Sequence, residues 1–184
     1  MGFTDRRNLI LRTLVAAIAF LAVTALPATA LAQPHWYRGE EAQVTVYVER
    51  TSVGDTNWSY VKRAGAEWAR SSRIQVEFVK RCPSSTYCVK VYQVHSSRNM
   101  AGWATLNYDP STNTAWYGSL HLNTRHLASD GARRKTACHE LGHVVGLDHR
   151  RTGRTCMGDG FDTMYGHPDA TDDAHLRRIY ARAS

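Results

Sequence analysis

The stretch that most constrains the fold of this 184-residue chain runs from His139 to His149 and reads H-E-x-x-H-x-x-G-x-x-H. Residues four apart on an α-helix lie on one face, with their Cβ atoms about 6 Å apart. His139 and His143 can therefore present two imidazole nitrogens to a single metal ion. A glutamate, a glycine and a third histidine also stand at the positions that the full motif specifies. This pattern argues against the alternative that the first two histidines are ordinary surface residues of an amphipathic helix.

The other positions of the motif favour a metal site that performs catalysis. Glu140 lies about 100° around the helix from His139, where it borders the metal without ligating it and can act as a general base. Gly146 can adopt the left-handed conformation that ends a helix, and the turn that results could bring His149 back to the metal. Three neutral imidazoles leave the fourth position of a tetrahedral zinc for water, so we expect one catalytic Zn²⁺ bound by His139, His143 and His149.

At these residues the chain resembles the metzincin metallopeptidases, whose zinc motif has this extended form and is followed by a turn that contains methionine. The resemblance implies that the three histidines bind zinc and that Glu140 is the catalytic base and acid. It assigns the turn methionine to Met157, eight residues after His149, with Met164 as the alternative. Met157 is favoured because Cys156 beside it can tether that loop.

Local sequence patterns along the chain, namely alternating or β-branched runs, helical spacing and capping residues, predict five strands and three helices. The expected strands are 44–48, 74–79, 88–94, 102–108 and 116–123, and the expected helices cover about 58–71, 132–145 and a closing segment, with N-caps at Asp55 or Thr56, at Ser129 or Asp130, and at Thr171. By resemblance the fold class is α+β, a zincin-like metzincin catalytic domain with a mixed, largely parallel five-stranded sheet. The cleft would lie between a part spanning about 43–146 and a smaller part spanning 147–184.

The resemblance also implies where a substrate would lie. In the family an edge strand pairs with the extended substrate, and either 102–108 or 116–120 would supply that strand here. The loop 158–168 would line the pocket for the residue that follows the scissile bond. Tyr165 and His167 are the substrate-pocket residues that we expect in this loop.

The first 32 residues read as a signal peptide. Three arginines precede an apolar run at 14–26, and Ala30-Leu31-Ala32 matches the A-x-A pattern of a cleavage site. The apolar run is shorter than the roughly 20 residues that a transmembrane helix needs, so we expect no stable membrane anchor. We therefore expect an extracellular protein in which residues 33–184 form one peptidase domain.

Export from the cytosol makes two disulfides the expected state of the four cysteines. Three pairings are possible. Cys82 and Cys88 flank a short loop, which favours their pairing and leaves Cys138 with Cys156. The second bridge would tie the ligand helix to the loop that carries the turn methionine, and closing a loop of this length contributes roughly 3 kcal/mol.

Charge and composition limit the partners of the chain. The formal net charge of +7 indicates a solvated basic face in a secreted domain. No nucleic-acid-binding motif accompanies this charge, so we expect no nucleic-acid partner, and we expect a monomer. A structural Ca²⁺ would need the oxygen atoms of Asp109, Asn113, Asp159 and Asp162, but no ligand loop with recognisable spacing supports one.

Together these patterns predict a secreted zinc-dependent endopeptidase that hydrolyses protein or peptide substrates. Glu140 would take a proton from the attacking water and pass it to the leaving amine. Two alternatives stay open at the level of sequence. One is a secreted zinc-containing binding protein on a peptidase scaffold, and the other is a zinc amidase that acts on a non-peptide amide.

Overall fold

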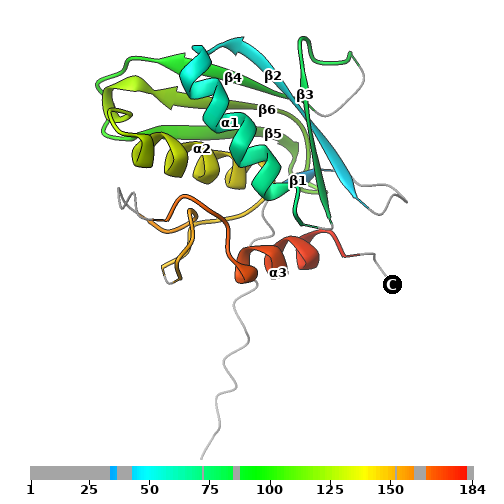
Figure 1. The fold of residues 1–184 in the computed structure, drawn as a ribbon. Helices are drawn as coiled ribbons and strands as arrows, with labels where there is room; N and C mark the ends of the chain where they lie inside the picture. The colour runs from blue at the N-terminus through cyan, green and yellow to red at the C-terminus, as the bar shows by residue number, and fades with distance from the viewer. Residues whose placement is uncertain are drawn as a thin grey trace, which may run out of the picture. The chain divides into compact units, whose positions relative to one another are not determined.

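Two helices cover one face of a twisted sheet, and a third helix lies beyond their ends (Figure 1). The computed structural model describes residues 34–36, 43–71, 73–84, 88–151, 153–159 and 165–181. The expected signal peptide, Met164 and Asp162 lie outside these ranges. No helix within the described ranges has the length and apolar character that a membrane crossing requires.

Within the described ranges the sheet contains six strands in the order β3-β2-β4-β6-β5, with the short β1 beside the start of β6. Their bounds are β1 His35–Trp36, β2 Val44–Ser52, β3 Ile74–Val79, β4 Cys88–Val94, β5 Gly102–Asp109 and β6 Thr114–Asn123. Every pairing is parallel except that of β5 with β6, which is antiparallel. The mixed, largely parallel sheet is thus confirmed, with a sixth strand of two residues that is too short to give a periodic signal.

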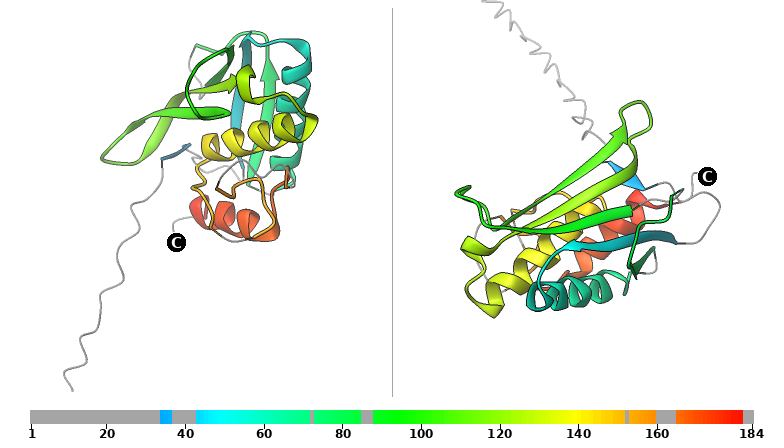
Figure 2. Two further views of the ribbon diagram at one scale, coloured as in Figure 1. Left: turned by 90° about the vertical axis from the view of Figure 1, so that its left-hand side faces the viewer. Right: turned by 90° about the horizontal axis from the view of Figure 1, so that it is seen from above.

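The helices are α1 (Asp55–Trp68), α2 (Asp130–Val144) and α3 (Ala170–Ile179). Figure 2 shows α1 and α2 side by side on the same face of the sheet. The core between these layers is formed by alternate residues of the strands, such as Val46 and Val48 of β2, and by Trp68 of α1, all at most 1% exposed. Burial of such side chains contributes about 25 cal/mol per Å² of apolar surface and holds the two helices on the sheet.

The N-cap residues of the three helices agree only in part with those predicted from the sequence. Ser129 caps α2 by accepting a hydrogen bond from the amide of Ala132 at 3.1 Å, as predicted. The N-cap of α1 is Gly54, without a side-chain hydrogen bond, so the prediction of an Asp55 or Thr56 cap was wrong. The cap of α3 is Asp169 and not Thr171, because only Asp169 forms a reciprocal capping box with the third helical residue.

The carboxyl end of α2 is where the chain reverses, and this reversal positions the third histidine of the motif. Gly146 has a φ of +94°, and its amide donates to the carbonyl of His143 at 3.0 Å. Two carbonyl groups at this helix end accept hydrogen bonds from distant side chains. Trp36 Nε1 donates to the carbonyl of Val144 at 2.7 Å, and the hydroxyl of Tyr180 donates to the carbonyl of Val145 at 3.1 Å. The turn is therefore held by both β1 and the end of α3.

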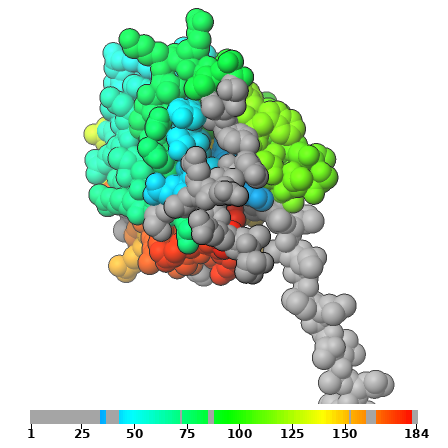
Figure 3. Space-filling view, turned by 90° about the vertical axis from the view of Figure 1, so that its right-hand side faces the viewer, coloured from blue at the N-terminus to red at the C-terminus, as the bar shows by residue number. Residues whose placement is uncertain are grey.

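Strands β5 and β6 form a long hairpin at one side of the sheet. In the space-filling view this hairpin stands out from the rest of the molecule's face (Figure 3). Its exposed aromatic side chains, Tyr108 and Trp116, are 39% and 52% exposed. Nearer to α2 the same strand β5 forms part of a cleft.

Candidate metal centre

The side chains of His139, His143 and His149 converge on one point. The Nε2 atom of His139 lies 3.1 Å from the Nε2 atom of His143 and 3.1 Å from that of His149. One ligand atom from each ring lies within 4.8 Å of the others, and this is the single such group of three among the described residues. The first two rings come from α2, and the third comes from the chain that returns after Gly146.

Each of the three rings is held from behind through its Nδ1 atom. Nδ1 of His139 lies 2.7 Å from the carbonyl oxygen of Cys156, and Nδ1 of His143 lies 2.8 Å from the carbonyl oxygen of Leu147. Nδ1 of His149 lies 3.1 Å from a carboxylate oxygen of Asp159. All three partners are acceptors, so each ring donates its Nδ1 proton and keeps a lone pair on Nε2. The rings are therefore oriented and protonated as metal ligands require.

Three convergent lone pairs repel one another unless a cation lies between them. Nitrogen ligands about 2.0–2.1 Å from a tetrahedral zinc lie roughly 3.3 Å apart, close to the separations observed here. Burial lowers the pKa of His139 to about 4 and also lowers the pKa of His143, which keeps both rings neutral. The donor set and its geometry thus fit Zn²⁺.

A cavity of about 350 Å³ opens beside the three histidines. One wall is α2, which contributes Thr136 and Glu140, and the opposite wall is β5, which contributes residues 102–104. The two walls approach closely, because a Cβ atom on Gly102 would lie 2.8 Å from Cγ of Glu140 and 2.8 Å from Cγ2 of Thr136. A glycine at this position is needed to admit the Glu140 side chain between helix and strand.

Glu140 is 5% exposed and lies at the wall of this cavity next to the three histidines. Burial raises the pKa of its carboxyl group to about 8, and a hydrogen bond from the backbone of Ala104 opposes part of that effect. A carboxylate with a pKa in this range binds a proton readily near neutral pH. This property suits a group that must both accept and return a proton.

The same hydrogen bond shows which side of β5 faces the cleft. In an antiparallel ladder, alternate residues direct their amide and carbonyl groups to opposite sides of the strand. Because Ala104 bonds to Glu140, its backbone groups point away from β6 and toward the cleft. Among the described residues β5 pairs only with β6, so its cleft side is an open edge of the sheet, whereas the segment 116–120 lies inside the sheet between β4 and β5.

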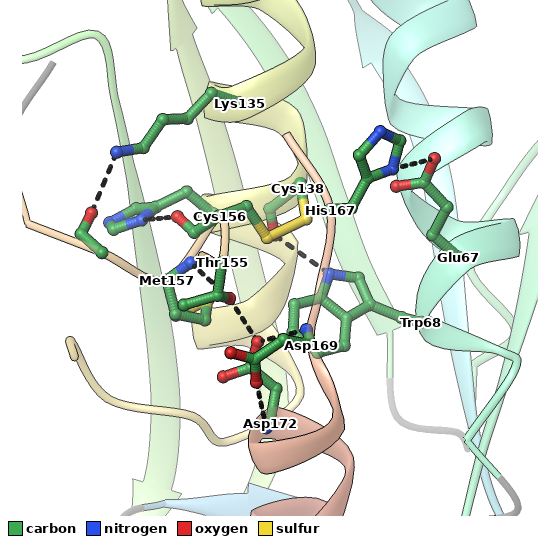
Figure 4. The surroundings of a disulfide bond; sticks show 12 residues. Glu67, Trp68, Lys135, Cys138, Thr155, Cys156, Met157, His167, Asp169 and Asp172 are labelled. Carbon is green, nitrogen blue, oxygen red and sulfur yellow. Dashed lines mark hydrogen bonds and ion pairs between the residues drawn. A yellow bond between two sulfur atoms is a disulfide. The ribbon is translucent and has the colours of Figure 1, made fainter. Parts of the chain in front are cut away.

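Met157 lies directly beneath the ligand helix and is fully buried. A Cβ atom on Gly142 would clash with the Met157 sulfur, so the helix turn between the histidines rests on this side chain. The disulfide between Cys138 and Cys156 joins the helix to the loop just before Met157 (Figure 4). Because the Cys156 carbonyl is also the acceptor for His139, this bridge helps to place a ligand as well as the loop.

Comparison with solved structures identifies the fold. Myroilysin superposes with a TM-score of 0.51 and 13% sequence identity, covering 82% of this chain and 97% of myroilysin. High choriolytic enzyme 1, a hatching enzyme zinc-protease from the medaka fish Oryzias latipes, gives a TM-score of 0.52 and 12% identity, covering 80% of this chain and 94% of that protein.

The chain has a metzincin-like fold. At these identities the likeness establishes the fold and not the reaction. Sequence comparison finds no family model and no curated protein that matches the chain. The structural likeness therefore supports the fold that the extended motif indicated.

In this metzincin-like fold, the loop after the third histidine is anchored to α3 by a buried polar network. The guanidinium of Arg150 donates to Asp169 at 2.5 Å and to Asp172 at 2.9 Å. Asp172 is fully buried and also accepts from the hydroxyl of Thr155, whose oxygen in turn accepts from the amide of Met157 at 3.1 Å. The smaller carboxyl-terminal part of the fold is thus tied to the loop beneath the metal ligands.

The two expected substrate-pocket residues lie in different places. His167 pairs with Glu67 at 2.9 Å and lines a separate cavity on the α1 side of the disulfide (Figure 4). The structure therefore does not place His167 at the metal cleft. Tyr165 lines another cavity, which shares Lys135 and Asp159 with the cleft.

The residues considered for calcium are not grouped within the described part of the chain. Asp109 accepts hydrogen bonds from the amide and hydroxyl of Ser111 in the turn between β5 and β6, where Asn113 has a φ of +54°. Asp159 instead holds the ring of His149. The role of these two aspartates in the structure is therefore local hydrogen bonding, and a calcium site stays untested.

Sequence reasoning missed two residues of the centre. Asp159 was considered only as a calcium ligand, although it orients His149. Lys135 was not assigned to the site, although it is 6% exposed and lines the cleft. Its position four residues before His139, on the same helical face, was the available signal.

Proposed function

We propose that this chain is a secreted zinc-dependent endopeptidase that hydrolyses peptide bonds in proteins or peptides. The observation that carries the proposal is the arrangement around the cleft. Three Nε2 atoms converge beside the Glu140 carboxyl group, and the opposite wall is the open edge of β5. A metal site, a proton carrier and a binding edge for extended polypeptide therefore lie within one cavity.

His139, His143 and His149 would hold the zinc ion, with their Nδ1 partners fixing the ring orientations. A bound zinc ion acidifies water and polarises a carbonyl group, which is the chemistry that amide hydrolysis needs. Losing a partner of such a ligand typically costs about 10- to 100-fold in metal affinity or activity. Met157 would serve as the turn methionine that supports the ligand helix from below.

An extended substrate would lie along β5 as an added strand. Residues 102, 104 and 106 direct their backbone groups to the cleft side, as the bond between Ala104 and Glu140 indicates. Pairing through backbone groups binds a polypeptide without requiring particular side chains. This mode of binding favours a peptidase over an enzyme that acts on a small non-peptide amide.

Glu140 would carry the proton during hydrolysis. Its carboxylate takes a proton from water as the water attacks the scissile carbonyl carbon, holds that proton on a carboxyl oxygen and delivers it to the leaving amine nitrogen. The burial that raises the pKa of Glu140 favours the protonated state that must exist between these two transfers. General acid–base catalysis of this kind contributes about 10²- to 10⁴-fold in rate.

Secretion is part of the same proposal. The amino-terminal 32 residues have the pattern of a cleaved signal, and all four cysteines are paired, as Cys82–Cys88 and Cys138–Cys156. Disulfides persist mainly in oxidising compartments. We therefore place the active protein outside the cytosol.

The test is to express the full chain, collect the processed protein and digest a diverse peptide library, with products identified by mass spectrometry. We expect internal cleavage that a chelator abolishes and one equivalent of zinc restores. Glu140→Gln should bind zinc normally and lose at least about 10²-fold in kcat. Glu77→Gln, on β3, is the matched control and should keep full activity. Zinc binding without cleavage of any peptide would favour the binding-protein alternative, and cleavage of non-peptide amides alone would favour an amidase.

A further inference from the structure

The rim of the cleft is formed by residues 96–101, which connect β4 to β5 and which we call the rim segment. These residues belong to no helix or strand, and four of them, 97–100, are exposed. Asn99, Met100 and Ala101 nevertheless line the cavity that contains the three histidines. A segment outside regular secondary structure needs other hydrogen bonds to keep one conformation.

The side chain of Asn123, the last residue of β6, supplies these bonds. Asn123 is fully buried. Its Nδ2 atom donates to the carbonyl groups of Ser96 at 3.1 Å, Arg98 at 3.3 Å and Met100 at 3.0 Å. Its Oδ1 atom accepts from the amide of Ser96 at 3.0 Å. Because an amide nitrogen only donates and its oxygen only accepts, these surroundings fit an asparagine and do not fit an aspartate.

Further contacts hold the rim segment against its neighbours. The backbone amide of Asn123 donates to the carbonyl of Ala101 at 2.8 Å, which continues the ladder between β5 and β6 by one residue. Nε2 of His126 lies 2.9 Å from the carbonyl oxygen of Arg98, and the Arg98 guanidinium lies 4.8 Å from the centre of the Trp103 ring. All of these contacts lie within the chain, so the fold itself sets the position of the rim segment.

The same hydrogen bonds determine what the rim segment can offer to a bound polypeptide. The carbonyl groups of Arg98 and Met100 are directed at the buried Asn123 side chain, which does not line the cavity. The Met100 side chain, in contrast, lies at the cavity wall and is 42% exposed. The backbone edge of β5 begins at Gly102, and beyond that residue a polypeptide in the cleft meets side chains of the rim segment.

We propose that Asn123 is a positioning residue of the peptidase: its amide holds the rim segment as a preformed wall of the cleft, and Met100 is the apolar contact that this wall makes with the polypeptide. The inference rests on the proposed peptidase function. A wall that is already ordered avoids the loss of entropy that ordering it on binding would cost. Asn123 neither lines the cavity nor adjoins one of the three histidines in sequence, so it acts on substrate affinity and not on zinc binding.

Asn123→Asp tests the amide, because it keeps the shape of the side chain and removes both donor hydrogens. We expect KM for a cleaved peptide to rise about 10-fold at constant kcat, since fixing the backbone of a single residue on binding costs about this factor. A rise in KM alone indicates lost binding that is uniform along the reaction. Asn57→Asp is the matched control and should leave KM unchanged, because Asn57 is also buried but donates to Gln93, away from the cleft.

Met100→Ala tests the contact without altering the buried network. We expect KM to rise about 3- to 10-fold for the partial loss of apolar contact area. In the Asn123→Asp background the same change should have a smaller effect, because the loosened rim segment no longer holds Met100 in place. Hydrogen exchange should be faster at the amides of Ser96 and Arg98 in Asn123→Asp than in the wild type.

Binding provides a readout that does not depend on turnover. In the zinc-loaded Glu140→Gln protein, fluorescence anisotropy of a labelled peptide should show that Asn123→Asp and Met100→Ala weaken binding by the same factors. The zinc dissociation constant, measured by chelator competition, should stay at the level of the wild type. The same holds for inhibition by acetohydroxamate, a small ligand that binds through the metal.

The outcomes separate this inference from the peptidase proposal. Wild-type peptide affinity in folded Asn123→Asp or in Met100→Ala overturns the inference alone, and so does an equal loss in Asn57→Asp or a weakened affinity for zinc. Thermal melting identifies folded variants, and Asn123→Ser, which keeps one donor, replaces Asn123→Asp if the latter does not fold. Absence of both cleavage and peptide binding in the zinc-loaded wild type overturns the peptidase proposal and this inference together.

Discussion

The bridge between Cys138 and Cys156 should affect stability and metal binding together, unlike the other disulfide. It closes a loop with a sequence separation of 18, which in the chain-entropy model corresponds to about 3 kcal/mol at 25 °C. The bridge between Cys82 and Cys88 has a separation of 6 and corresponds to about 2 kcal/mol by the same relation. Replacing either pair by alanines should therefore destabilise the fold, the first pair by about 1 kcal/mol more.

The effect on zinc should separate the two pairs much more clearly. The Cys156 carbonyl accepts the Nδ1 proton of His139, and Cys138 immediately precedes that histidine in α2. Releasing the loop from the helix loosens this acceptor, and weakened support of a ligand typically costs about 10- to 100-fold in metal affinity. The bridge between Cys82 and Cys88 joins the first residue of β4 to the loop before that strand, and neither cysteine adjoins one of the three histidines in sequence. Removing this bridge should therefore leave zinc affinity unchanged.

Two measurements test this reasoning. Urea unfolding in the presence of a chelator gives the stability of each double variant without the contribution of bound metal, which would otherwise add to it. Competition with a chromophoric chelator gives the zinc dissociation constant. The reasoning is refuted if removing Cys138 and Cys156 leaves zinc affinity at the level of the wild type, or if both pairs weaken zinc binding equally.

Two further predictions concern the residues around the centre. Asp159→Ala removes the acceptor of the His149 ring, and zinc affinity measured by the same competition should fall about 10- to 100-fold, with stability of the metal-free protein nearly unchanged because the side chain is 57% exposed. The second prediction concerns the stability of the fold in acid. Burial opposes ionisation of the Asp169 carboxyl group, but hydrogen bonds from backbone amides and the guanidinium of Arg150 have the larger effect. The pKa of Asp169 is therefore held below its usual value. Its contribution is therefore present above the unfolded-state pKa of about 3.9 and is lost as pH falls through the lower folded-state pKa. Urea unfolding between pH 5 and 3 in chelator should show a shallower loss of stability for Asp169→Asn than for the wild type, and equal slopes would contradict the assignment.

Local spacing explains why so much of this centre could be predicted. The relation of His139 to His143 follows from the period of the α-helix, and the reversal at Gly146 follows from the left-handed conformation that glycine tolerates. The five long strands and the three helices were also predicted from local signals: β-branched or alternating runs for the strands, and helical spacing or capping residues for the helices. The short loop between Cys82 and Cys88 favoured the pairing that the structure contains.

Other features depend on segments that are distant in sequence and meet only in the fold. No local pattern shows that β5 is the open edge, because edge position depends on which strands pair with it. The cap of α3 was misplaced because Asp169 and Thr171 are both acceptable capping residues, and the choice between them is made by packing and by the partnership of Asp169 with Arg150.

The sequence by itself predicted which three histidines converge and which glutamate lies beside them, because helical periodicity and one glycine turn fix their spacing within eleven residues. Only the tertiary structure decided what surrounds them. The acceptor behind His139, the strand opposite Glu140 and the burial of Lys135 all come from contacts between separate elements. Such contacts are set by the packing of the whole core, which no short stretch of sequence specifies.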